Sequence, residues 1–141
     1  DRPQKGRYRE FYQCDVDIIG TSALEAEAEL LLIYKRAFKA LNIRNYQVRI
    51  NHRKLLQGVA AYIGAPDQFG ALTVAIDKLD KIGREGVEQE LRARIGFSDD
   101  QINRLNKVFD AGANLNELGK LLQSEDAIQG LTDLKQLLEP C

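Results

Sequence analysis

Hydrophobic and polar residues alternate along the chain from about Glu10 to Gly20. Successive side chains of a β-strand point to opposite faces of its sheet, so this alternation predicts a strand. One face is apolar enough to be buried, and its residues are Tyr12, Cys14, Val16 and Ile18. On this face Cys14 is expected to be an inert, buried thiol.

Residues 23–41 have the spacing of an amphipathic helix, with apolar residues mostly three or four positions apart. Ser22 and Glu25 match a capping box at its start, and Asn42 is suited to end it. Alternation returns from Tyr46 to Asn51 and predicts a second strand. The chain up to residue 52 is therefore interpreted as strand, helix and strand, as in an antiparallel sheet.

Every periodic segment after about His52 is helical in pattern. Gly83 to Gly86 interrupts the pattern, Gly96 ends a helix, and Ser98 with Gln101 forms a second capping box. The expected helices cover 53–63, a stretch opened by Pro66, 87–95, a stretch after Ser98, 115–122 and 127–138. The predicted fold class is α+β, with a mixed domain over residues 1–52 and an all-α domain over 53–141.

Composition excludes several classes of protein. The 141 residues are 44% hydrophobic and 29% charged, which is ordinary for a soluble globular domain. Two distant cysteines and one histidine argue against a disulfide scaffold and a histidine-rich metal site, and they fit a reducing cytosol. No apolar run approaches the ~20 residues of a transmembrane helix. The formal net charge of −1 does not suggest nucleic-acid binding overall.

Two stretches near the start carry candidate chemistry. Arg2 to Arg9 is a basic segment that fits a phosphate-binding hairpin loop or, equally simply, a solvated basic turn. The second face of the first strand, with Phe11, Gln13, Asp15 and Asp17, fits a solvated surface or a site for a small zwitterion. At about 3.3 Å per residue, Gln13 and Asp17 would stand roughly 13 Å apart, with space for such a ligand between them.

Two other polar features are interpreted as structural. The charge run Asp77, Lys78, Asp80 and Lys81 is expected to be a solvated helix end, because each acid has a lysine beside it. His52 is expected to start a helix rather than to bind a ligand. The sequence contains no P-loop, no dinucleotide-binding glycine motif and no zinc-ligand spacing.

The segments RPQKGRYREFYQCDVDIIG, VRINHRKLLQGV and AIDKLDKIG together resemble the histidyl-tRNA synthetase family, a class II aminoacyl-tRNA synthetase family. The resemblance runs through the chain and is weakest after about Asp110. It implies an antiparallel catalytic sheet with motif 2 in residues 1–52. It also implies that the helical region is the insertion domain, which lies over the acceptor arm of tRNA in this family.

The resemblance also implies roles for individual residues. Arg2 and Gln4 match positions that contact the acceptor end of tRNA. Arg7 resembles the catalytic loop arginine that reaches the ATP phosphates, and Phe11 resembles the aromatic residue that stacks on adenine. Gln13 and Asp17 match the groups that hold the amino group and the imidazole of the histidine substrate, although some relatives have Glu in place of Asp17. No metal ligand is expected among these residues.

A further implication is that the 141 residues are a fragment, because motifs 1 and 3 and the anticodon-binding domain are not recognised in them. The parent protein is then expected to be a cytoplasmic, non-membrane homodimer that uses ATP with Mg²⁺, L-histidine and tRNA(His). The fragment alone is expected to be inactive and to hold no cofactor. Its exposed strand edges predict self-association.

Two alternatives stay open at this stage. The first is a synthetase-like regulatory subunit of histidine biosynthesis that has lost aminoacylation. The second is an independent helical interaction module with a strand–helix–strand cap, which predicts a compact monomer.

Overall fold

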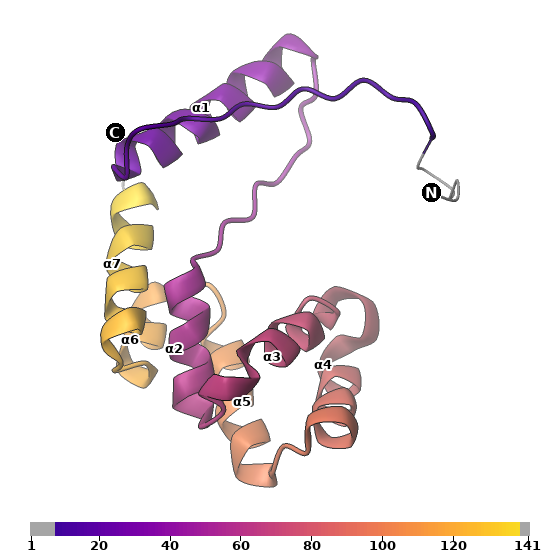
Figure 1. Cartoon of the computed structure of the whole chain (residues 1–141), viewed down its shortest axis with the longest axis vertical. Coiled ribbons are helices and arrows are strands. Elements are labelled where there is room, and N and C mark those ends of the chain that lie inside the picture. Colours follow the sequence, from indigo (N-terminus) through magenta and orange to yellow (C-terminus); the bar gives the residue numbers. More distant parts are fainter. Residues whose placement is uncertain (1–7, 139–141) are drawn as a thin grey trace. The chain divides into compact units, whose positions relative to one another are not determined.

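The computed structural model describes residues 8–138 (Figure 1). The chain divides into two compact units at Tyr46 and Gln47, and each is described by itself. The domain assignment of 1–52 and 53–141 stays a prediction. The helical segments are α1 (Leu24–Ala40), α2 (Arg53–Ile63), a 3-10 helix (Pro66–Gln68), α3 (Phe69–Ile76), α4 (Leu79–Glu90), a π-helix (Leu91–Ile95), α5 (Asp99–Ala111), α6 (Leu115–Leu121) and α7 (Glu125–Leu138).

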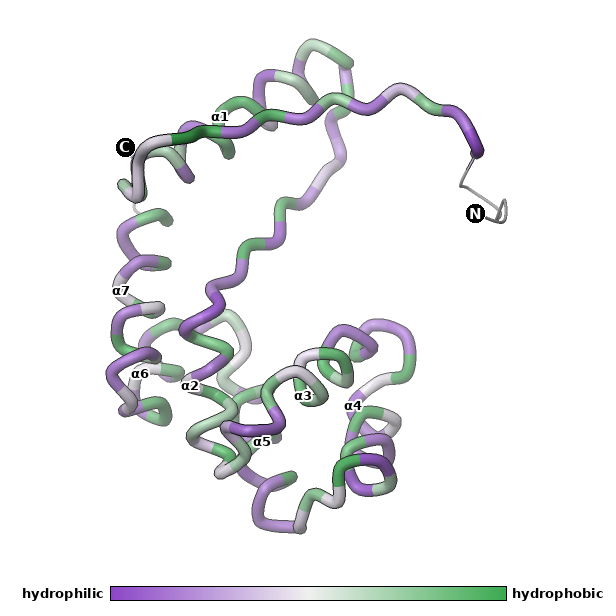
Figure 2. The backbone as a smooth tube through the Cα atoms, in the orientation of Figure 1, coloured by the Kyte–Doolittle hydropathy of each residue, from purple (hydrophilic) through white to green (hydrophobic). Residues whose placement is uncertain are grey.

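The predicted strand–helix–strand sheet is wrong for the described chain. Residues 8–138 contain helices and irregular segments but no β-strand, so the α+β class is corrected to all-α. The segments 11–19 and 46–52 have no regular secondary structure, although their hydropathy alternates as Figure 2 shows. Alternation specifies two faces, but a strand also needs a neighbour that accepts its backbone hydrogen bonds. No such ladder forms among the described residues.

The first unit consists of the extended segment, α1 and the turn after it. The predicted capping box of α1 does not form: Ala23 is the N-cap, it makes no side-chain cap, and its N–H donates to Thr21 Oγ1 at 3.1 Å. At the other end Asn42 adopts a left-handed φ of 57° and ends the helix as predicted. The Phe38 and Tyr46 rings are 4.5 Å apart, so the turn folds back along α1.

The second unit is helical from Arg53 onward, as predicted. Its core is a single cluster of buried apolar side chains from α2 through α7. The largest fully buried side chains are Ile63, Leu72, Val87, Leu91, Ile102, Leu105 and Leu122. Helix α2 packs against α3, α5 and α7, so it is the central element of this unit.

Local signals in this unit match the expectations. His52 is the N-cap of α2, which confirms it as a helix-start residue. Ser98 and Gln101 form the predicted capping box of α5, with Gln101 N–H donating to Ser98 Oγ at 3.3 Å. Gly83 has φ 68° and ψ 177° and kinks α4, and Gly96 ends the π-helix in the left-handed region.

Candidate functional site

The predicted substrate-binding residues that the structure describes all lie on the extended segment before α1. Phe11 is 69% exposed, and Gln13 and Asp17 are also exposed. Arg2, Gln4 and Arg7 lie outside the described residues. Phe11, Gln13 and Asp17 therefore share one open stretch of chain, and none of them lines either of the two hollows described below.

The side-chain amide of Gln13 forms hydrogen bonds with a neighbouring side chain of the same segment. Its Nε2 donates to both carboxylate oxygens of Asp15 at 2.9 Å. This contact joins two polar positions two residues apart, as expected for side chains on the same face of an extended backbone. The amide is consequently occupied by a local carboxylate, and a bound ligand would have to displace that carboxylate to reach it.

The predicted apolar face of the same segment is not buried. Tyr12 is fully exposed, Val16 and Ile18 are exposed, and Cys14 is an exposed free thiol rather than a buried one. This face is exposed for the same physical reason that the sheet does not form. A two-faced segment buries its apolar side only against a second layer, and every residue from 8 to 22 is exposed in the structure.

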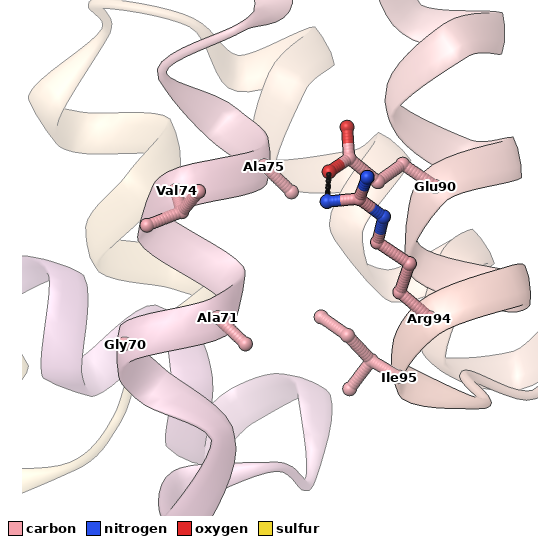
Figure 3. A pocket seen from close by; sticks show the side chains of 7 residues that line it. All are labelled: Gly70, Ala71, Val74, Ala75, Glu90, Arg94 and Ile95. Carbon is pink, nitrogen blue, oxygen red and sulfur yellow. Dashed lines mark ion pairs between the residues drawn. The ribbon is translucent and has the colours of Figure 1, made fainter.

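A hollow of about 320 Å³ lies between α3 and the end of α4 with the following π-helix. Figure 3 shows small side chains on the α3 side, with Glu90 and Arg94 facing them. Its lining consists of Gly70, Ala71, Val74, Ala75, Glu90, Arg94 and Ile95. The small residues leave the space open, and the ion pair between Arg94 and Glu90, 3.0 Å long, provides its polar edge.

Glu90 is the electrostatic centre of this edge. Lys78 Nζ lies 2.5 Å from Glu90 Oε1, and this hydrogen bond is the main reason that the pKa of Glu90 is below its ordinary value of 4.5. Partial burial of the carboxyl opposes the shift, and the positive charges of Lys78 and Arg94 add to it. The carboxylate is thus held ionised between two cations. This arrangement suits a structural ion pair better than a group that transfers protons.

The charge run around Lys78 is only partly the solvated helix end that was predicted. Asp77, Asp80 and Lys81 are exposed, in agreement with that prediction. Lys78 is the exception, because it reaches across to Glu90, twelve positions later in the sequence. Sequence spacing did not reveal this contact, since Lys78 is the N-cap residue of α4 and Glu90 ends it, with the kink at Gly83 between them, and the pair lies beyond the helical i,i+4 range.

A second hollow, of about 390 Å³, lies beside the segment that precedes α2. It is lined by Arg49, Ile50, Asn51, Ile76, Asp77, Leu79 and Asp80. Arg49 forms an ion pair with Asp80 across it, and both side chains are mostly exposed. A further contact joins His52 Nε2 to Asp133 Oδ2 on α7 at 3.1 Å.

The described residues contain no group of three or more His, Cys, Asp or Glu side chains placed to hold a metal ion. Of the helices between residues 8 and 138, none combines the length and the apolar character needed to cross a bilayer.

Comparison with known proteins decides the family. The model of the histidyl-tRNA synthetase family matches residues 1–140. The chain belongs to the histidyl-tRNA synthetase family. Phe11, Gln13 and Asp17 therefore lie within the matched region, and so does the whole helical unit as far as it is described.

Individual members of the family are similar along nearly the whole chain. The histidine–tRNA ligase of Cytophaga hutchinsonii is 48% identical over 142 aligned residues, covering 97% of this chain and 31% of the ligase. The ligases of Porphyromonas gingivalis and Helicobacter pylori are 44% and 36% identical over 99% of this chain, covering 31% and 33% of their own lengths. The chain thus spans about a third of the length of these curated relatives.

Proposed function

We propose that this chain is part of a class II histidine–tRNA ligase that activates L-histidine with ATP and transfers it to tRNA(His). The observation that carries the proposal is the family match over residues 1–140, together with the names of the relatives. In the proposed reaction the histidine carboxylate attacks the α-phosphorus of ATP, and pyrophosphate leaves. The histidyl group then passes from the adenylate to the 3′ end of the tRNA.

The catalytic contribution is mainly positioning and charge stabilisation, so no nucleophilic side chain is needed. ATP enters with Mg²⁺ as a substrate, and Arg7 meets its phosphates while Phe11 stacks on the adenine. Gln13 binds the amino group of histidine and Asp17 binds its imidazole. Arg2 and Gln4 contact the acceptor end of the tRNA, and the helical unit lies against the acceptor arm. The exposure of Phe11 and Asp17 supports this, because both side chains are accessible to a ligand, whereas the exposed Gln13 would first have to leave Asp15.

The proposed parent protein is a cytoplasmic homodimer, as the family resemblance implies, and the 141 residues alone are inactive. Histidine-dependent exchange between ATP and pyrophosphate tests both parts. The full-length protein should show exchange and charge tRNA(His), and the isolated chain should show neither. Charging without a contribution from this region, or exchange by the isolated chain, would contradict the proposal. A parent protein that binds histidine but never charges tRNA would instead indicate the regulatory alternative.

Two substitutions in the full-length protein distinguish the proposed roles and serve as controls for each other. Asp17→Asn should raise the KM for histidine by at least about tenfold, because a charge-assisted hydrogen bond is lost, with a smaller change in the KM for ATP. Phe11→Leu should raise the KM for ATP more than the KM for histidine, since it removes the ring that stacks on adenine. Equal changes in both constants for both variants would refute the assignment.

A further inference from the structure

His52, the last residue before α2, uses both nitrogens of its ring. Nδ1 accepts a hydrogen bond from the backbone N–H of Lys54 at 3.2 Å, which caps α2. Nε2 lies 3.1 Å from Asp133 Oδ2 on α7. A ring nitrogen that accepts carries no proton, so the neutral imidazole has its proton on Nε2 and donates it to Asp133. The contact therefore does not require a charged histidine.

Asp133 is held on both of its oxygens. Gln129, one turn earlier on α7, donates from Nε2 to Asp133 Oδ1 at 2.7 Å, and His52 approaches the other oxygen. The side chains of His52 and Asp133 are only 25% and 19% exposed. A hydrogen bond to a carboxylate that is partly shielded from water is stronger than one at the open surface. This pair is thus a specific contact with little freedom to rearrange.

The backbones beneath the pair approach each other closely. A Cβ at Gly130 would lie 2.7 Å from the backbone nitrogen of Leu55 and 3.0 Å from His52 Nδ1. A Cβ at Gly58 would lie 2.3 Å from the Cβ of Ala127. Helices α2 and α7 consequently pack side by side at a distance that only glycine allows at these two positions (Figure 1). The His52–Asp133 pair closes one end of this rigid helix pair.

The connecting segment 47–52 enters the helical unit at this end. It has no regular secondary structure, so specific side-chain contacts must define its path. Asn51 Oδ1 accepts the backbone N–H of His52 at 2.8 Å, and Arg49 pairs with Asp80. Arg49 and Asp80 are 72% and 69% exposed, so that pair contributes little by itself. The stronger contact of the segment is His52 with Asp133.

We propose that the His52–Asp133 pair is a positioning contact that fixes how residues 47–52 join the helical unit. Without it, the imidazole keeps only its hydrogen bond from the N–H of Lys54, and the segment loses its contact with α7. A consequence for catalysis rests on the proposed function. If the helical unit guides tRNA while residues near the start bind histidine and ATP, loss of the pair slows transfer to tRNA more than histidine activation.

Three variants and one control test the structural claim in the 141-residue chain. His52→Asn keeps a side chain that caps α2 but does not reach Asp133. Asp133→Ala removes the acceptor, and the double variant removes both. Gln129→Ala is the matched control, because it takes away the other partner of Asp133 and leaves His52 in place. Hydrogen exchange of the backbone amides of residues 51–54 is the measurement.

We expect hydrogen exchange at residues 51–54 to be about fivefold faster in each single variant than in the unaltered chain, as after a modest loss of local stability. The double variant should exchange no faster than either single variant, because both substitutions remove the same contact. The Gln129→Ala chain should exchange at nearly the rate of the unaltered chain. Unchanged exchange in both single variants, or a double variant with the summed effect of the two, would overturn the positioning role.

The catalytic consequence is measured separately in the full-length protein. Asp133→Ala should lower kcat/KM for tRNA charging by about fivefold, while histidine-dependent ATP–pyrophosphate exchange changes by less than about twofold. Equal losses in the two reactions would overturn this part. If the unaltered protein neither activates histidine nor charges tRNA, the proposed function fails, and hydrogen exchange still decides whether the pair positions the segment.

Discussion

Helices α1 and α2 have similar patterns but opposite surroundings. Both carry a regular apolar stripe, yet α1 has no buried residue, whereas α2 buries Leu55, Val59, Ala60 and Ile63. Leu32 of α1 is 51% exposed, although its position in the stripe predicts an inward face. Periodicity therefore identifies the face that a helix can bury, whereas burial itself requires neighbouring elements.

The largest test of this contrast exchanges one leucine in each unit for alanine. Leu105→Ala in α5, where the side chain is 0% exposed, should lower the free energy of unfolding of the helical unit by about 2–5 kcal/mol. Leu32→Ala in α1 should change the free energy of unfolding of the chain by less than about 0.5 kcal/mol, because the side chain is half exposed and loses little contact. Urea unfolding followed by circular dichroism measures both. Similar losses for the two variants would show that α1 is packed as tightly as α5.

A smaller effect is expected from a methyl group added between α2 and α7. Gly58→Ala should destabilise the helical unit by about 1–3 kcal/mol, because the new Cβ would collide with Ala127. Gly70→Ala in α3 is the matched control, since a Cβ there would have no atom within 4 Å beyond its chain neighbours and the nearby backbone of its own helix. That change should be neutral or stabilising by up to about 1 kcal/mol, because alanine favours a helix. The midpoint temperature of thermal unfolding should therefore fall for Gly58→Ala and stay the same or rise for Gly70→Ala.

The two predicted capping boxes provide a further comparison between the units. Ser98→Ala should cost about 1 kcal/mol, because the hydroxyl caps α5 through the N–H of Gln101. Ser22→Ala should have almost no effect, since α1 has no side-chain cap. Denaturant midpoints of the two variants measure the difference. Equal shifts would mean that Ser22 caps α1 in solution.

The smallest effect concerns Glu90 and depends on pH. Since its pKa is lowered in the folded chain, ionised Glu90 stabilises the fold above about pH 4.5, and this contribution disappears as the pH falls through the folded-state pKa. Glu90→Gln should therefore destabilise the chain at pH 7 and lose this effect in acid. Glu85→Gln, at an exposed position of the same helix, is the control. A pH-independent effect of Glu90→Gln would exclude the ion pairs as its cause.

The helical unit could be predicted well because its signals act within a few residues. Ser98 and Gln101 cap α5, Gly83 breaks α4 and His52 begins α2, and each of these depends on neighbours three or four positions away. The prediction of strands was wrong. Tyr12, Val16 and Ile18 have the alternation of a strand, but they are exposed and no neighbouring strand among the described residues pairs with their segment. For the candidate site, the resemblance assigned residues to roles, and the structure describes Phe11, Gln13 and Asp17 only as exposed side chains on one extended segment.

The amino-acid sequence by itself determined where most helices begin and end, and it carried the family resemblance that the comparisons confirmed. Only the tertiary structure decided that α2 is buried while α1 is exposed, and that His52 meets Asp133. The physical reason is range. Capping and periodicity are interactions between near neighbours, whereas burial and the contact between α2 and α7 arise when distant segments pack together.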